Sequence, residues 1–153
     1  MSANVRLPAT LLLSFVFIVL FSGSNVAMGR EMSETLPAKI RIAGSNGEAV
    51  IILYDTPVSR DFISLLPLSM TFRDYAGEEK IADIPRKLKT SGGAVRNDIQ
   101  GDFAYYAPWG NLAVFYKGFG KASGLYILGR IESGKNWLAG LSRNFAARIE
   151  IIE

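Results

Sequence analysis

The 153-residue sequence contains neither cysteine nor histidine. Without cysteine no disulfide can form, so burial and hydrogen bonds must hold the fold together even in an oxidising compartment. The lack of histidine excludes Ser-His and Cys-His nucleophiles and an imidazole general base. Together the two absences exclude zinc and copper sites built from His or Cys. We therefore expect no metal site and no cofactor.

Neither sign of charge predominates, and the basic excess is small. The whole chain has 17 basic and 14 acidic residues. Arg6 is the only charged residue among residues 1–29, so residues 30–153 carry 16 basic and 14 acidic residues and a net charge of +2. No basic stripe stands out, and the composition gives little support for binding to nucleic acid.

Long apolar runs are also scarce, with one exception near the N-terminus. Arg6 precedes an apolar stretch from Leu11 to Phe21, which is followed by small residues that include Ala27-Met28-Gly29. This order is typical of a secretory signal peptide, and the stretch is shorter than the roughly 20 residues of a membrane-spanning helix. We expect residues 1–29 to be removed, with an uncleaved anchor as the alternative. Residues 30–153 would then form one periplasmic or secreted domain that does not associate with the membrane.

Alternation with period two dominates the rest of the chain and predicts about eight strands. Asn46-Gly47 predicts a hairpin turn, and Thr56-Pro57 predicts the start of a helix that ends before Pro67. The expected strands cover residues 39–42, 48–54, 68–75, 79–84, 102–107, 111–117, 125–132 and 145–152, and the expected helices cover 57–66 and 133–141. Residues 85–101 have no sustained period and predict a long loop. So many short strands with so few helices favour a closed β-barrel, because closure removes unprotected strand edges.

The densest chemical signal is aromatic. Seven of the seventeen residues from Phe103 to Phe119 are aromatic, and a Pro-Trp-Gly-Asn turn interrupts the run. Alternation places Phe103 and Tyr105 on one side of a strand and Tyr106 on the other, and it sets Phe115 opposite Tyr116. One set must fill the core. The other set, with Trp109 and Phe119, lines a ligand groove or simply packs on the barrel.

Other motifs have ordinary interpretations. Gly129 to Asn136 resembles a phosphate-binding loop, but Asn136 replaces the Ser or Thr of that motif and Gly129 lies inside a predicted strand. Ser123 with Lys121, or Ser133 with Lys135, has no diagnostic spacing for a Ser-Lys nucleophile. The acidic residues of 74–83 are expected to form a solvated strand edge rather than a calcium site. The basic residues of loop 85–101 are usual for a surface, although they could meet an anionic group on a ligand.

Taken in order, these segments resemble the cyclophilins over the whole predicted domain. The resemblance lies in Ile40 to Tyr54, in Asp55 to Phe62, in Ile99-Gln-Gly-Asp-Phe103 and in Ile127 to Gly134. Compact bacterial cyclophilin-like proteins are similar in the further segments Leu65-Leu-Pro-Leu68, Asp74-Tyr-Ala-Gly77, Ile84-Pro-Arg-Lys-Leu88 and Tyr105-Tyr-Ala-Pro-Trp-Gly-Asn111. The resemblance implies a closed cyclophilin-like barrel of about eight strands with one or two short helices.

The same resemblance implies prolyl isomerisation, with Arg86 as the catalytic arginine and Gln100 as the residue that holds the substrate backbone. The sequence departs from that pattern. The family's Phe-His-Arg reads Ile84-Pro-Arg86, its paired phenylalanines read Ala113-Val114 with Phe115 beside them, and the histidine of its proline pocket is absent.

The departures argue against catalysis, and the aromatic density together with the basic loop favours a domain that binds an extended peptide or a small apolar ligand. The residues expected to bind are Arg86, Gln100, Tyr105, Trp109, Phe115 and Phe119. A peptidyl-prolyl isomerase of low activity and a purely structural or interaction module are the alternatives.

Overall fold

The computed structural model describes residues 37–90, 102–118 and 122–153. The predicted signal peptide, most of the predicted loop 85–101, and the residues Gln100 and Phe119 lie outside these ranges. Along the described chain the elements are β1 (Lys39–Gly44), β2 (Gly47–Leu53), α1 (Pro57–Ile63), β3 (Leu68–Tyr75), β4 (Glu79–Asp83), β5 (Phe103–Tyr106), β6 (Asn111–Phe115), β7 (Leu125–Ser133), α2 (Lys135–Gly140) and β8 (Phe145–Ile151).

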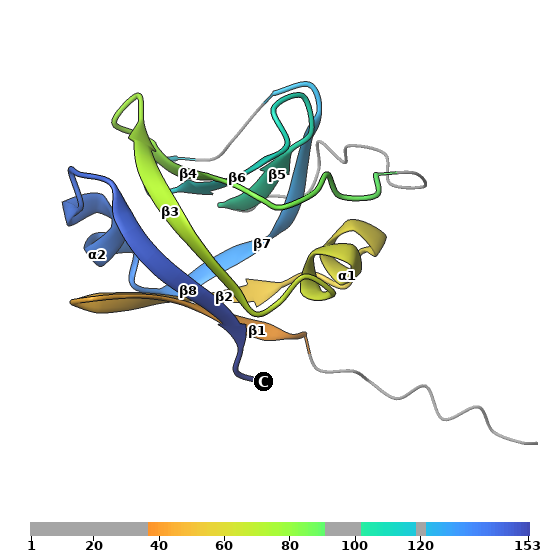
Figure 1. Cartoon of the computed structure of the whole chain (residues 1–153), viewed down its shortest axis with the longest axis horizontal. Helices are drawn as coiled ribbons and strands as arrows, with labels where there is room; N and C mark the ends of the chain where they lie inside the picture. The colour runs from red at the N-terminus through yellow and green to blue at the C-terminus, as the bar shows by residue number, and fades with distance from the viewer. Residues whose placement is uncertain (1–36, 91–101, 119–121) are drawn as a thin grey trace, which may run out of the picture. The chain divides into compact units, whose positions relative to one another are not determined.

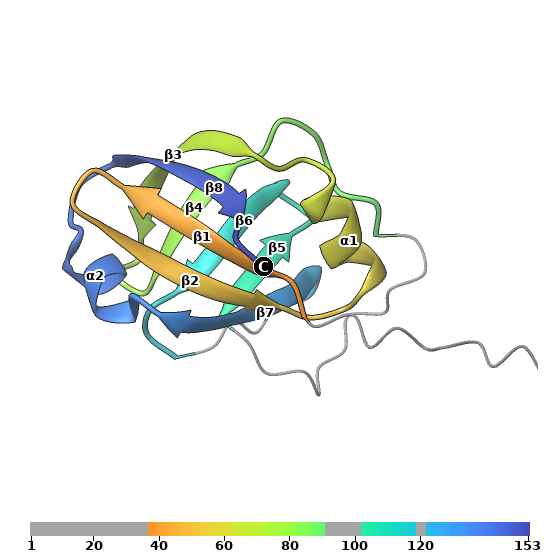
Figure 2. The same ribbon diagram turned by 90° about the horizontal axis from the view of Figure 1, so that it is seen from below.

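The eight strands form one closed antiparallel barrel, in the order β1-β2-β7-β5-β6-β4-β3-β8. In Figure 2, β3, β8, β1, β2 and β7 cross the front of the barrel, while β4, β6 and β5 cross behind them. The strand β8 closes the barrel by pairing with β1 on one side and β3 on the other. The predicted mainly β fold, with a closed barrel and two short helices, is confirmed.

Alternation places branched apolar side chains inside the barrel. In β1, Ile40 and Ile42 are fully buried and lie opposite Ile51 and Ala49 of β2. In β8, Ala147 and Ile149 are buried while Arg148 and Glu150 face outward. Large side chains from six strands and α1 fill the centre: Ile40, Ile42, Ile51, Phe62, Phe72, Phe103, Leu112 and Leu128.

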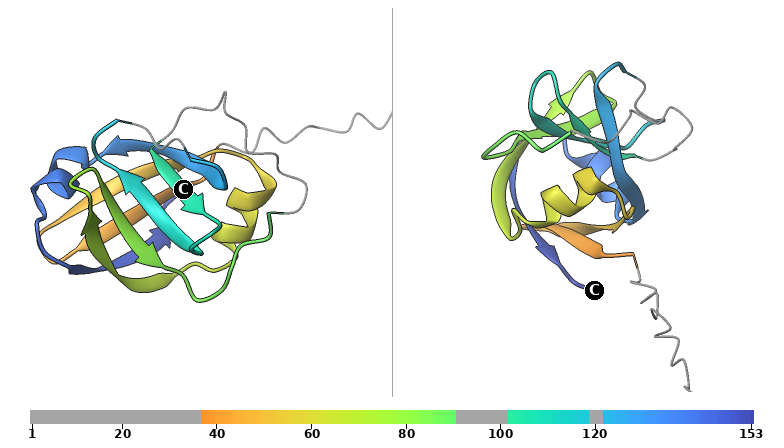
Figure 3. Two further views of the ribbon diagram at one scale, coloured as in Figure 1. Left: turned by 90° about the horizontal axis from the view of Figure 1, so that it is seen from above. Right: turned by 90° about the vertical axis from the view of Figure 1, so that its right-hand side faces the viewer.

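The helix α1 lies at one end of the barrel, and α2 lies at the other (Figures 1 and 3). The Thr56 side chain caps α1 by accepting a hydrogen bond from the backbone N–H of Ser59, and Pro57 occupies the first turn. The helix ends at Ile63, three residues earlier than predicted. Leu65 and Leu66 donate instead to the carbonyl oxygens of Phe62 and Ile63, which tightens the chain into turns ahead of Pro67.

The helix α2 packs on the β1–β2 hairpin through Trp137. The indole ring lies so close to Gly44 and Gly47 that a Cβ on either residue would overlap it. The indole N–H also donates to the Asn46 side-chain oxygen over 3.3 Å, and the ring contacts Phe145 edge-on. The glycines of the hairpin therefore make room for the helix.

Within the described ranges, no helix has both the length and the apolar character needed to cross a membrane.

Candidate ligand-binding site

The aromatic run divides between the two faces of the barrel wall. Phe103 and Tyr105 of β5 are buried in the core, and the Tyr105 hydroxyl accepts a hydrogen bond from the backbone N–H of Leu88 over 3.2 Å. Tyr106 points to the outer face with Phe115 of β6, whereas Tyr116 is turned inward. The predicted split between a core set and an outer set is confirmed.

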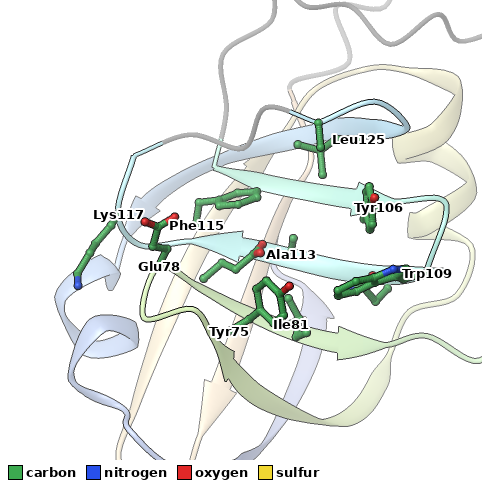
Figure 4. A pocket seen from close by; sticks show the side chains of 12 residues that line it. Tyr75, Glu78, Ile81, Tyr106, Trp109, Ala113, Phe115, Lys117 and Leu125 are labelled. Carbon is green, nitrogen blue, oxygen red and sulfur yellow. The ribbon is translucent and has the colours of Figure 1, made fainter.

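The outer set borders a pocket of about 390 Å³ on the outer wall of β3, β4, β6, β5 and β7 (Figure 4). We call it the outer pocket; its volume falls within the range of small-molecule sites. It is lined by Tyr75, Glu78, Glu79, Ile81, Tyr106, Trp109, Asn111, Ala113, Phe115, Lys117, Ala122 and Leu125.

Strand register explains why these residues meet. Ile81 of β4 lies opposite Ala113 of β6, and Glu79 lies opposite Phe115. Tyr106 lies between Asn111 on β6 and Leu125 on β7. Residues that face the same side on neighbouring strands lie close enough to interact, so alternate positions of five strands produce one continuous surface.

Four rings form what we call the aromatic cluster: Tyr75, Tyr106, Trp109 and Phe115. Trp109 lies on the turn between β5 and β6. In this turn the Gly110 backbone N–H donates a hydrogen bond to the Tyr106 carbonyl oxygen, and Gly110 has a positive φ of 74°. The turn holds the indole edge-on to Tyr75 and to Tyr106, with ring centroids 5.5 Å apart in both pairs. Trp109 is nevertheless 55% exposed and Tyr75 is 43% exposed, an unusual degree for rings this large.

Polar groups lie among these rings. Glu78 and Glu79 both line the outer pocket. Burial raises the pKa of the Glu79 carboxyl, and the negative charge of Glu78 raises it further. Asn111 is 1% exposed at the edge of β6, where its amide N–H donates to the Leu112 carbonyl oxygen over 3.0 Å.

An ion pair between buried Lys80 and partly exposed Asp74 lies next to the pocket-lining residues Tyr75 and Glu79. Lys80 is 1% exposed, and its Nζ donates to Asp74 Oδ1 over 2.5 Å and to the Leu141 carbonyl oxygen beyond α2. The Tyr116 hydroxyl donates to the same Asp74 oxygen over 2.7 Å. Burial, together with this bond to a carboxylate, raises the pKa of Tyr116 to about 12. The network connects β3, β4, β6 and the end of α2 directly behind the outer pocket.

Comparison with known proteins identifies the family. A model of the cyclophilin-like family matches residues 40–150, which include every strand of the barrel except the first residue of β1 and the last residue of β8. The chain belongs to the cyclophilin-like family.

A solved structure agrees with this assignment at the level of the fold. The solution structure of a hypothetical protein from Archaeoglobus fulgidus superimposes with a TM-score of 0.52 at 20% sequence identity, over 75% of this chain and 95% of that one. Among curated proteins, none matches the chain.

In this cyclophilin-like chain, the structure separates the residues that the sequence singled out for binding. Trp109 and Phe115 line the outer pocket. Tyr105 is 1% exposed inside the barrel, and its neighbour Tyr106 is the one that lines the pocket. Gln100 and Phe119 lie outside the described residues. Binding by any of these residues stays a prediction.

Arg86 is held at α1 rather than among the pocket-lining residues. Its two terminal nitrogens donate to the two carboxylate oxygens of Asp61 over 2.7 and 2.9 Å, and one of them also reaches Ser64 Oγ over 3.2 Å. This bidentate pair holds the pKa of the Asp61 carboxyl down at about 2. The role of Arg86 in catalysis stays a prediction.

The sequence did not identify several of the residues that line the pocket of this cyclophilin-like chain. Tyr75, Ile81 and Asn111 each belong to a segment with clear period-two alternation or to the Trp-Gly-Asn turn. The alternation shows which residues share a face of their own strand. It does not show that β4 pairs with β6. That pairing brings the pocket residues of the two strands together next to the aromatic cluster.

Some of the other sequence motifs can be placed in the structure, although Lys121 lies outside the described residues. Gly129 lies inside β7, as predicted, and a phosphate-binding loop would instead begin after a strand. Lys135, the lysine considered as the partner of Ser133, donates to Asp102 Oδ2 over 3.0 Å. Within the residues that the structure describes, no group of three acidic side chains could hold a metal ion.

Proposed function

We propose that this exported cyclophilin-like domain binds an extended peptide or a small apolar ligand in the outer pocket and does not catalyse a reaction on it. The observation that carries the proposal is the exposure of the aromatic cluster, above all Trp109 at 55%. The barrel core is already filled by other rings, so the four outer rings are not needed to close it. Large rings left at a concave surface favour ligand binding.

The isomerase alternative has less support from the described geometry. It depends on Arg86 and Gln100. The guanidinium of Arg86 is occupied by Asp61, and Gln100 lies outside the described residues. Both terminal nitrogens of Arg86 bind Asp61, and Arg86 does not line the outer pocket. The binding function is therefore the one that we put forward.

A ligand screen tests the binding function directly. The chain has two tryptophans, Trp109 in the outer pocket and Trp137 in α2, so its ¹H–¹⁵N NMR spectrum has two indole signals. Proline-containing and apolar peptides should shift the Trp109 signal in a saturable manner and leave the Trp137 signal in place. The matched control is Ile151→Ala. It shortens another exposed side chain, on β8 and outside the pocket lining, and should leave the titration unchanged. If no peptide or apolar fragment moves the Trp109 signal, the binding function is wrong and the structural alternative gains support.

A protease-coupled proline peptide assay tests the alternative. We expect turnover at the uncatalysed rate, both in the wild type and in Arg86→Ala. Turnover well above that rate, abolished in Arg86→Ala, would establish the isomerase instead.

A further inference from the structure

The outer pocket is aromatic but not apolar throughout. Its lining also includes two carboxylates and a buried amide oxygen, and these polar groups indicate the charge of the ligand.

The amide oxygen of Asn111 has no donor among the described residues. The Leu112 carbonyl can only accept, so the NH₂ end of the Asn111 amide must face it and Oδ1 must face elsewhere. An acceptor left buried without a donor costs about 1–3 kcal/mol. A ligand that brings an N–H group into the pocket would remove that cost.

Glu79 is the second unmatched group. The carboxylates of Asp61, Asp74, Asp102 and Glu150 each pair with a Lys or Arg. Over the same described ranges, Glu79 has no cation within salt-bridge distance although it is half-buried beside Glu78, another acidic residue. Burial of a charge without a partner is costly, so an incoming cation would be favoured here.

Lys117 lines the pocket but does not neutralise these carboxylates. Figure 4 shows its side chain running away from the aromatic cluster, and its Nζ lies 5.8 Å from the ring centroid of Tyr116. The amine is therefore directed to the flank of the outer pocket, and among the described residues it makes no ion pair with Glu78 or Glu79.

The aromatic cluster favours the same ligand charge. Faces of aromatic rings attract cations, Trp most strongly, and a cation held by several rings is a known arrangement for ammonium groups. Trp109 lies edge-on to both Tyr75 and Tyr106, so the three rings are turned at steep angles to one another. A neutral apolar ligand would use the rings alone, and an anionic one would be repelled by Glu78 and Glu79.

We propose that the outer pocket takes an alkylammonium group, with its charge between Glu79 and the aromatic cluster and an N–H donated to Asn111 Oδ1. This inference rests on the proposed function, because it concerns the same pocket. A free amine and the side chain of a lysine in a peptide share this chemistry.

The test compares probes that share a chain and differ in the head group: butylammonium, 1-butanol, butyrate and butyltrimethylammonium. Each is titrated into the purified protein while the indole signals of Trp109 and Trp137 are followed by NMR. Butylammonium should shift the Trp109 signal with at least fivefold higher affinity than 1-butanol, and butyrate should not bind. Butyltrimethylammonium, which carries the charge but no N–H, should bind several-fold more weakly than butylammonium.

Substitution of one carboxylate gives the complementary test. Glu79→Gln should weaken butylammonium at least fivefold and leave 1-butanol unchanged. Glu132→Gln is the matched control. Glu132 lies on β7, pairs with Lys39 of β1 and does not line the pocket, so this substitution should leave the affinity for butylammonium unchanged.

Each outcome separates the two claims. If 1-butanol or apolar peptides bind as well as butylammonium, the cation inference is overturned and the binding function stands. If butyltrimethylammonium matches butylammonium, the hydrogen bond to Asn111 is overturned. If no probe and no peptide moves the Trp109 signal, the binding function itself fails. An acetylated, amidated Ala-Lys-Ala peptide that binds more tightly than butylammonium would assign the site to peptides, and equal or weaker binding would assign it to free amines.

Discussion

At the scale of single residues, Asp61 makes the densest set of charged contacts at the α1 end of the barrel. It is 11% exposed and accepts hydrogen bonds from both terminal nitrogens of Arg86 and from the backbone N–H of Lys89. One carboxylate thus holds the segment after β4 against α1. This contact also explains why Arg86 is not free to face the outer pocket.

We predict that Asp61→Asn lowers the free energy of unfolding by about 1–2 kcal/mol at neutral pH, the usual value of charge-assisted bonds. The folded pKa of about 2 lies below the ordinary value of 3.8, so the stabilisation is complete above about pH 4 and is lost as the pH falls towards 2. Urea unfolding of both proteins at pH 7 and pH 2.5 should show a difference that largely disappears at the lower pH.

The matched control for that experiment is Asp55→Asn. Asp55 is 64% exposed and pairs with Arg60 at the surface, where ion pairs contribute little. A difference between Asp61→Asn and the wild type that persists undiminished at pH 2.5 would contradict the assignment to the ionised carboxylate.

Tyr116 provides a second prediction at the residue scale. Its hydroxyl is buried and donates to Asp74, the acceptor shared with Lys80. Tyr116→Phe should lower the free energy of unfolding by about 1 kcal/mol, because the Asp74 oxygen loses one of its donors. Thermal and urea unfolding would measure the effect. Tyr75→Phe removes a hydroxyl from an exposed ring and is the control; an equal loss in both variants would contradict a role for the buried network.

At the scale of elements, the alternation in the sequence predicts the strands. The close approach of neighbouring strands then limits which residues can occupy particular positions. Gly129 of β7 lies opposite Leu53 of β2 and Phe103 of β5, next to an irregularity in the β5 pairing. A Cβ at Gly129 would overlap the carbonyl oxygen of Ile52. Since backbone cannot rotate away as a side chain can, the close approach of β2 and β7 requires glycine there.

We therefore predict that Gly129→Ala lowers the free energy of unfolding by about 2 kcal/mol or more, through strain between two strands. Gly140→Ala in α2 is the matched control. A Cβ at Gly140 meets nothing within 4 Å, and alanine favours a helix, so that variant should be neutral or slightly more stable. Chemical denaturation of both variants distinguishes the two; similar stabilities would show that β2 can move aside.

At the scale of the whole barrel, closure depends on β8. This strand pairs with β1 and β3, so it joins the two ends of the sheet. Its Ala147 and Ile149 are part of the core. Without β8, two strand edges would be unpaired and the core would be open to water on that side.

Removal of residues 145–153 should therefore abolish cooperative thermal unfolding and the dispersed NMR spectrum of a folded barrel. Removal of only Ile152 and Glu153, which follow β8, should leave both features in place. A truncated chain that still melts cooperatively would show that the sheet is stable when open.

Alternation, turn residues and the helix start by themselves determined the eight strands, both helices and the inward or outward direction of most side chains. They separated Tyr105 from Tyr106, because successive residues of a strand point to opposite faces. The end of α1 was predicted three residues too late, since turn bonds compete with helical ones over Ser64 to Leu66. Only the tertiary structure decided that β4 lies between β3 and β6. That order brings Tyr75, Ile81 and Glu79 into the lining of the same pocket as Trp109. It depends on which strands pair across long separations, for which local periodicity carries no signal.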